Sequence, residues 1–373
     1  MSESVFGRYP REGTNEHFRV LMLGFRESNT REGAPASTLR GSPPTYFMTT
    51  NDDWRTLPTG YFTHELALAP NPLDGAPEAA ARIDAIESRM LVGGLDERVD
   101  RRLCGPAERT TVELAHDPEY LDRLERASAG DPEALARFSM PDMRVGADTY
   151  RAAMCSAGAV VEAVDALLER TVRNVFCAVR PPGHHAGRAR ASGFCFVNNV
   201  AVGALYALRR RRLERVAVID FDVHHGDGTE EIVAENPSVR FFSLFQWPLF
   251  PDRRIVPTPS NVVATPLTAG ADGTTLREIV EGLWLPKLEA FRPQMIFLSS
   301  GFDAHTEETM AQLKFSEVDY AYLTRRLVDA SEALCDGRLV SVLEGGYSLR
   351  SLARSVLVHL QMLGRNRTST TPP

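Results

Sequence analysis

Residues 147–363 alternate short apolar runs with longer segments in which apolar residues recur every three or four positions. The short runs predict buried strands at residues 175–179, 216–219, 239–244, 295–298 and 339–343. The longer segments predict helices at residues 147–171, 199–213, 229–235, 274–291, 316–335 and 349–363. Strands that alternate with helices predict an α/β fold, with a mostly parallel central sheet and helices on both faces.

The rest of the chain is less regular. Residues 1–60 are rich in Gly, Pro, Ser, Thr and Arg, which indicates a loop-rich N-terminal arm or lid. No hydrophilic linker interrupts the later strands and helices, so we expect a single α/β domain over residues 61–364. We expect residues 365–373 to form a disordered tail.

Composition narrows the class of protein. The chain has 373 residues, of which 43% are hydrophobic, and this is enough for a sizeable core. Its net charge of −7 argues against nucleic-acid binding. The five cysteines are scattered without a CxxC pair, which indicates a reducing compartment. No apolar run reaches membrane-spanning length, so we expect a cytoplasmic protein that binds neither nucleic acid nor membrane.

Polar and glycine-rich segments follow the carboxyl ends of four predicted strands. These segments are Arg180–His185, Asp220–Asp227, Ser299–His305 and Glu344–Tyr347. The carboxyl ends of parallel strands meet at one edge of a sheet, and ligands bind at that edge in open α/β folds. We therefore expect the active site there.

The second of these segments has the residue types of a metal site. In an extended chain Asp220, Asp222 and His224 share one face, because side chains alternate. An aspartate and a histidine are good ligands for zinc and related ions. Asp303 is the best candidate for a third ligand, because its strand should end nearby. Three protein ligands would leave a position open, as in catalytic sites.

The adjacent histidines His184 and His185 follow a Pro-Pro-Gly turn and suit acid–base catalysis better than joint metal binding. Asp220 and Asp227 are spare carboxylates that could orient their rings. Asp227 lies in Gly-Asp-Gly-Thr and equally fits a turn or a helix cap. Tyr347 follows two glycines and could stabilise an oxyanion, although such a loop is also an ordinary turn.

The stretches RPPGHHA, GFCFVNN, VAVIDFDVHHGDGT, SSGFDAH and EGGYS, in this order, resemble the zinc-dependent deacetylases. This family comprises histone deacetylases, histone-deacetylase-like amidohydrolases and acetylpolyamine amidohydrolases. The resemblance is good over residues 110–363 and loose over 60–110. It implies hydrolysis of an acylated amine, such as an acetylpolyamine or acetyl-lysine, and a homodimer or homotetramer. Glu344 before Gly-Gly-Tyr resembles the bacterial amidohydrolase and class II branch.

The resemblance also implies roles for single residues. One Zn²⁺ would be held by Asp222, His224 and Asp303. His185 would be the general base and acid, oriented by Asp227, and His184 would tune the site, oriented by Asp220. Tyr347 would bind the oxyanion.

Further residues of the family pattern concern the substrate and a second ion. Gly193, Phe194 and Phe250 match the lining of the acyl-lysine tunnel, although Phe194 by itself fits a core aromatic equally well. Asp220 and Ser243 match positions of a potassium site, which implies a structural K⁺.

Two segments depart from the family pattern. Phe245 stands where the family usually has a histidine, and Asp252–Arg254 replaces flexible glycines, so we expect an altered tunnel mouth. An early signature resembling HPExPxR is degraded in Gly75–Arg82.

Two alternatives remain. A binuclear manganese ureohydrolase of the arginase type shares this architecture but needs a further aspartate where this chain has His305. A catalytically silent binding protein would have lost a metal ligand or Tyr347, and neither is lost.

Overall fold

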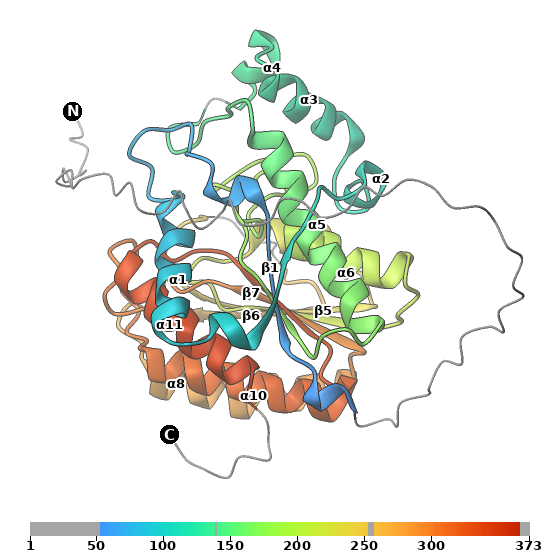
Figure 1. Ribbon diagram of the computed structural model, residues 1–373, viewed down its shortest axis with the longest axis vertical. Helices are drawn as coiled ribbons and strands as arrows, with labels where there is room; N and C mark the ends of the chain where they lie inside the picture. Colours follow the sequence, from blue (N-terminus) through green and yellow to red (C-terminus); the bar gives the residue numbers. More distant parts are fainter. Residues whose placement is uncertain (1–52, 139, 253–256, 366–373) are drawn as a thin grey trace, which may run out of the picture. The chain divides into compact units, whose positions relative to one another are not determined.

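The computed structural model describes residues 53–138, 140–252 and 257–365, which form an α/β unit around an eight-stranded sheet (Figure 1). The strands are β1 (Thr59–Thr63), β2 (Val99–Leu103), β3 (Val175–Cys177), β4 (Val216–Asp220), β5 (Val239–Gln246), β6 (Val262–Leu267), β7 (Met295–Ser300) and β8 (Leu339–Leu343). Their order is β2-β1-β3-β8-β7-β4-β5-β6, and every pair is parallel. The predicted α/β class is therefore confirmed.

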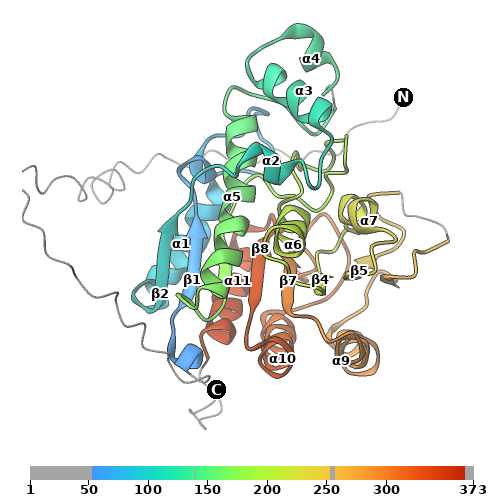
Figure 2. The ribbon, with the colours of Figure 1, turned by 90° about the vertical axis from the view of Figure 1, so that its right-hand side faces the viewer.

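Helices cover both faces of the sheet, as Figure 2 shows for α6 on one side and α9 and α10 on the other. One apolar core includes residues of α2 (Arg109–Val112), α3 (Pro118–Ser128), α4 (Pro132–Ala136), α5 (Thr149–Leu168), α6 (Asn199–Arg209) and α7 (Asp227–Val233). The other includes residues of α1 (Ala81–Val92), α8 (Gly273–Ile279), α9 (Leu285–Phe291), α10 (Glu317–Cys335) and α11 (Leu349–Leu363). No helix within the described residues is long and apolar enough to cross a membrane.

The alternation of side chains along β4 explains the two cores. Val216 and Val218 pack on the side of α5 and α6, and Ala217 and Ile219 pack on the side of α10 and α11. Because both faces are covered, every residue of this strand is buried. A continuous apolar run is what a strand of this kind requires.

The structure corrects several sequence predictions. The pattern analysis missed β1, β2 and β6, which extend the sheet at both edges. The predicted helix 274–291 is divided into α8 and α9 by a π-helical segment, Val280–Trp284. The predicted strand 175–179 ends at Cys177. Residues 1–52 and 366–373, which hold most of the predicted arm and tail, lie outside the described residues, and β1 begins two residues before the predicted domain boundary.

The strand order brings the chemistry-bearing segments together. β3, β8, β7 and β4 are consecutive neighbours in the sheet. The four polar segments noted in the sequence follow these four strands. All four therefore meet at the carboxyl edge, over the middle of the sheet.

Candidate active site

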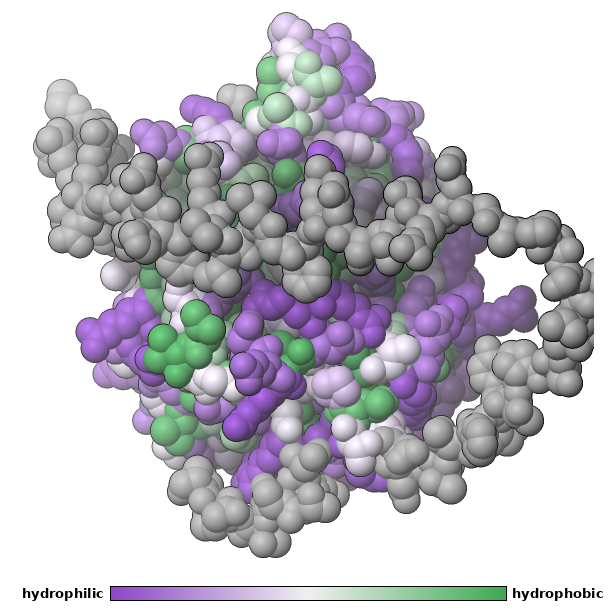
Figure 3. Space-filling view, viewed as in Figure 1, coloured by the Kyte–Doolittle hydropathy of each residue, from purple (hydrophilic) through white to green (hydrophobic). Residues whose placement is uncertain are grey.

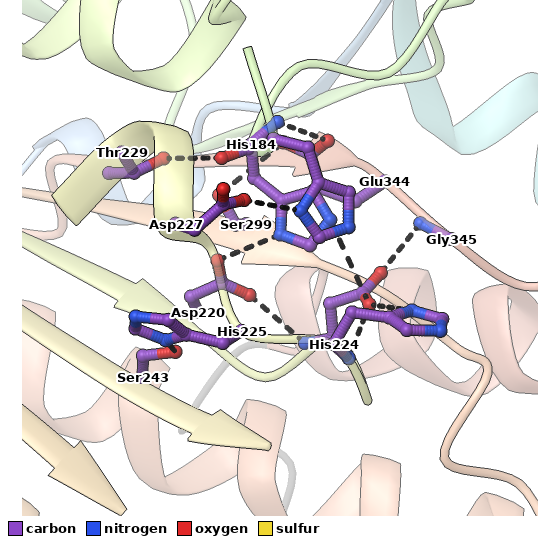
Figure 4. Close-up of polar contacts among 12 residues, drawn as sticks. His184, Asp220, His224, His225, Asp227, Thr229, Ser243, Ser299, Glu344 and Gly345 are labelled. Atoms are coloured by element: carbon purple, nitrogen blue, oxygen red, sulfur yellow. Dashed lines mark hydrogen bonds and ion pairs between the residues drawn. The ribbon is translucent and has the colours of Figure 1, made fainter. Parts of the chain in front are cut away.

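Three buried side chains form a candidate metal centre. Figure 4 shows one of them, His224, with neighbouring polar groups that include His184, Asp220 and Gly345. Asp222 and His224 follow β4, and Asp303 follows β7. One potential ligand atom from each lies within 4.8 Å of the other two. Nδ1 of His224 is 2.9 Å from Oδ1 of Asp222 and 3.1 Å from Oδ2 of Asp303. In the described part of the chain, this is the single group of three or more side chains with such an arrangement.

Backbone amides hold the two carboxylates in place. The N–H of Val223 donates to Oδ1 of Asp303 at 2.9 Å, and the N–H of Gly345 donates to Oδ2 of Asp222 at 2.8 Å. A Cβ atom on Gly345 would lie 2.2 Å from Oδ2 of Asp303, so this close approach requires glycine. The ligand geometry is thus supported by the loop that follows β8.

The charges of this cluster fit a divalent cation. Burial and the neighbouring Asp222 raise the pKa of Asp303 to about 6. Burial alone would lower the pKa of His224, but its contacts with the two carboxylates raise it to about 10. Oδ2 of Asp303 is buried without a hydrogen-bond partner among the described residues. Two adjacent buried carboxylates need compensating positive charge, and a metal ion bound by all three side chains would supply it.

Each of the tandem histidines is paired with an aspartate. Nδ1 of His184 is 3.0 Å from Oδ2 of Asp220, and Nδ1 of His185 is 2.9 Å from Oδ1 of Asp227. The two rings lie with their centroids 4.0 Å apart. Asp227 is also the first residue of α7, so it combines a helix start with this contact. The pairing that the sequence analysis expected is therefore present.

The surroundings shift the pKa values of His184 and His185 in opposite directions. Burial, together with the nearby His184, lowers the pKa of His185 to about 3. Burial would also lower the pKa of His184, but Asp220 and Asp222 raise it well above its usual value. Environments that separate the pKa values of two neighbouring groups are typical of acid–base sites.

Aromatic rings surround the histidines. The ring of Phe250 lies 5.0 Å from that of His185, and the ring of Phe194 lies 5.6 Å from that of Tyr347. A Cβ atom on Gly193 would lie 2.4 Å from Cδ2 of His185, and its φ of 51° favours glycine. Phe250 is 45% exposed, so it lies where the site meets solvent.

Tyr347 is held from two sides. Its backbone N–H donates to Oε2 of Glu308 at 2.8 Å. The guanidinium of Arg82 lies 5.0 Å from the centre of its ring. Burial, despite the opposing charge of Arg82, raises the pKa of Tyr347 well above its usual value. The phenol therefore keeps its proton at neutral pH and can donate a hydrogen bond.

Sequence reasoning missed the arginines that brace this site. Arg82 is fully buried, and its Nε donates to the carbonyl of Gly346 at 2.7 Å, while a second nitrogen donates to the carbonyl of Glu344. Glu78 accepts from Arg82 at 3.3 Å and from Nη2 of Arg180 at 3.0 Å. The retained Glu78 and Arg82 of the degraded signature were the available signal.

A comparison with known protein families agrees with this geometry. The family model described as "Histone deacetylase domain" matches residues 76–363. The chain belongs to the histone deacetylase family. It is similar to the histone deacetylase-like amidohydrolase of Pseudomonas aeruginosa, with 33% identity over 85% of this chain and 83% of that protein. The family thus groups the chain with deacetylases and amidohydrolases.

Two further members of the histone deacetylase family show its range. The mouse polyamine deacetylase HDAC10 is 34% identical over 77% of this chain, and the match spans 44% of that longer protein. The crystal structure of the HDA15 HD domain superposes with a TM-score of 0.76 and 28% identity. That match covers 85% of this chain and 92% of the HDA15 chain.

The structure places the remaining residues that the sequence analysis singled out in this family member. Phe245 is 1% exposed and its ring lies tilted against that of His225, with the centroids 4.5 Å apart, so Phe245 packs in the interior, while the altered tunnel mouth stays a prediction. His225, for which the sequence indicates only a structural role, contacts Ser243 at 2.9 Å and Glu230 at 3.1 Å, in agreement with that role. Ser243 pairs with Asp220 across the sheet, while the potassium site itself stays a prediction. Arg253 and Arg254 lie outside the described residues.

Proposed function

We propose that the protein is a zinc-dependent amide hydrolase that removes an acetyl or related acyl group from an amine. One observation carries this proposal: the three candidate metal ligands, the two His–Asp pairs and Tyr347 converge at one edge of the sheet. Asp222, His224 and Asp303 would hold one ion, and their mixed oxygen and nitrogen donors suit Zn²⁺. When bound, the ion polarises the amide carbonyl and acidifies a water molecule.

His185 acts first as a general base. Its low pKa keeps the ring neutral, and Asp227 fixes the tautomer that leaves Nε2 free to accept a proton from water. His184, which is held by Asp220, carries positive charge beside the reacting centre. The proton that His185 takes up is then returned to the departing amine nitrogen.

Tyr347 stabilises the oxyanion. Its hydroxyl donates to the carbonyl oxygen as negative charge develops on that oxygen during attack by water. Gly193, Phe194 and Phe250 enclose the acyl chain and the aliphatic part of the amine, because their rings and backbone line the approach to His185. The products are a carboxylate and a free amine.

A substrate panel tests this proposal. The zinc-loaded protein is assayed for kcat/KM on acetylputrescine, acetylspermidine, an acetyl-lysine peptide and a small aryl amide. We expect hydrolysis of at least one acylated amine, and its loss in protein stripped of metal. The similarity to a polyamine deacetylase is the reason for including the two acetylpolyamines in the panel. No hydrolysis of any of the four would instead support a silent binding protein.

A manganese ureohydrolase is the less favoured alternative. Nε2 of His305 lies 3.4 Å from Oε2 of Glu317, the first residue of α10. This side chain therefore faces a carboxylate of α10, and it is not a carboxylate that could help to bind a second metal ion. Two manganese ions per chain in a metal assay would contradict the single-ion site. The structural K⁺ at Asp220 and Ser243 and the homodimer or homotetramer stay predictions.

A further inference from the structure

A pocket next to the proposed active site is lined by residues of α3, of α4 and its C-terminal end, and of the segment 189–192. Its volume is about 750 Å³. Four of its lining residues are arginines and one is acidic: Arg123, Arg126, Arg137, Arg190 and Glu133. The projecting α3–α4 pair is visible in Figure 1, and Figure 3 shows hydrophilic and hydrophobic residues side by side over it.

Two of the four arginines have their charge compensated. Arg126 contacts Asp131 at 2.6 Å, and Arg190 contacts Asp227 at 2.8 Å and Glu231 at 3.4 Å. Within residues 53–138, 140–252 and 257–365, Arg123 and Arg137 make no ion pair or hydrogen bond through their side chains. The pocket therefore holds two guanidinium groups, those of Arg123 and Arg137, that no described carboxylate pairs with.

Glu133 does not change this balance. It lies 3.9 Å from Arg126, which already has Asp131, and its side chain is 82% exposed. The floor of the pocket is apolar and buried, with Tyr120, Ala134 and Phe138 each less than 7% exposed. An apolar floor lowers the local dielectric constant and strengthens the attraction between the arginines and an anion.

The pocket is adjacent to the proposed tunnel. Ser192 lines the pocket, and the next residue, Gly193, packs against the rings of His185 and Phe250. Arg190 lines the pocket as well, and it donates to the aspartate that holds His185. The pocket and the proposed tunnel thus share the segment 190–193 as a common wall.

We propose that this pocket binds a compact oxyanion, a carboxylate or phosphate, and that the oxyanion is an acidic group of the substrate near the acylated amine. Guanidinium groups match such oxyanions because their planar N–H groups form paired, charge-assisted hydrogen bonds. This proposal rests on the proposed hydrolase function and adds a substrate preference to it. It favours acyl-lysine substrates with acidic neighbours over purely cationic acetylpolyamines.

Two acetyl-lysine peptides test the proposal, one with glutamates on both sides of the acyl-lysine and one with glutamines. We expect the zinc-loaded wild-type protein to prefer the acidic peptide by about tenfold in kcat/KM, mainly through KM. The double variant Arg123→Gln/Arg137→Gln should reduce this ratio to near one. The matched control Arg89→Gln removes an exposed arginine from α1 and should keep the ratio. The preference should also shrink at high salt.

Calorimetry with inorganic phosphate gives a readout that does not depend on hydrolysis. Phosphate should bind the wild-type protein and Arg89→Gln, and binding should be lost in the double variant. Phosphate binding without a peptide preference would overturn the substrate assignment, because the pocket would then bind a free anion instead. Equal rates on both peptides together with no phosphate binding would overturn the proposal. No hydrolysis of either peptide, with phosphate still bound, would count against the proposed function alone.

Discussion

Tyr347 lies near the candidate metal ligands Asp222 and Asp303, and its hydroxyl makes no hydrogen bond to a described residue. We expect Tyr347→Phe to reduce kcat by about 100-fold or more, because a single oxyanion donor contributes this much in comparable sites. The ring and its contacts with Arg82 and Phe194 would remain. Steady-state kinetics and the zinc content of the variant measure this. Full activity in a zinc-loaded variant would remove Tyr347 from the mechanism.

Gly193 has both a positive φ and no room for a Cβ atom, and a pair of variants can tell these two reasons for glycine apart. In Gly193→Ala the new methyl group would collide with the ring of His185 and press on Phe250, so we expect kcat/KM to fall by more than tenfold. Gly94→Ala is the matched control, because Gly94 also has a positive φ, of 65°, but nothing within 4 Å of a Cβ atom. Each variant should lose about 1 kcal/mol of stability from the backbone conformation.

The two variants are compared by activity and by thermal unfolding. A loss of activity confined to Gly193→Ala would assign the effect to the collision with His185. Equal losses in both variants would mean that backbone strain accounts for the effect and that Gly193 has no special place in the site.

The loop after β8 depends on α1 for its position. Arg82 of α1 binds the carbonyls of Glu344 and Gly346, which flank the residue that holds Asp222. We expect Arg82→Gln to lower the free energy of unfolding by about 3–5 kcal/mol, because Glu78 would lose one of its buried partners. It should also lower kcat, because Tyr347 would lose its support.

Urea unfolding and kinetics at saturating substrate test this brace. Arg89→Gln in the same helix is the control, because Arg89 is exposed and should change neither quantity by much. Normal kcat in Arg82→Gln, measured where the protein is still folded, would show that the loop holds its shape without α1.

The strands that the sequence pattern predicted differ from the edge strands that it did not predict in how completely they are buried. β4, β5, β7 and β8 are covered by helices on both faces, so each needs an apolar run that a pattern search detects. β2 is an edge strand with the sequence Val-Asp-Arg-Arg-Leu, partly exposed along its length, and it lacks such a run. β6 is the opposite edge and contains a proline, which edge strands tolerate.

The same reasoning divides the site residues. Asp222, His224 and Asp303 were predictable because they directly follow strands whose ends must converge. Arg82 was not, because the two carbonyls that it binds lie more than 260 positions away, and its local spacing from Glu78 does not indicate them. Arg190 bonds Asp227 from a loop, where neither periodicity nor a strand end indicates a partner.

The stability of the whole molecule should depend on pH through three buried histidines that are not among the candidate metal ligands. Burial lowers the pKa of His64 and of His116 to about 4 and that of His359 to about 3. These rings are neutral in the folded state, whereas the unfolded chain binds protons below its pKa of about 6.5. The stability they contribute is therefore present above pH about 6.5 and lost as the pH falls toward 4.

Each of these histidines should lower the free energy of unfolding by about 1.4 kcal/mol per pH unit within that window. Urea unfolding at pH 7.5, 6 and 5 measures the slope. His359→Gln keeps a polar group near Thr324 and Ser341 but cannot titrate, so its slope should be shallower than that of the wild type. Identical slopes would show that His359 does not contribute.

In the proposed mechanism, one metal ion held by Asp222, His224 and Asp303 makes this protein an amide hydrolase. This is tested most directly by adding zinc in steps to metal-free protein and measuring release of acetate from the best substrate of the panel. We expect no activity at the start, a linear rise as zinc is added, and a plateau at one zinc per chain. Full activity in the metal-free protein, or a plateau at two ions per chain, would contradict it.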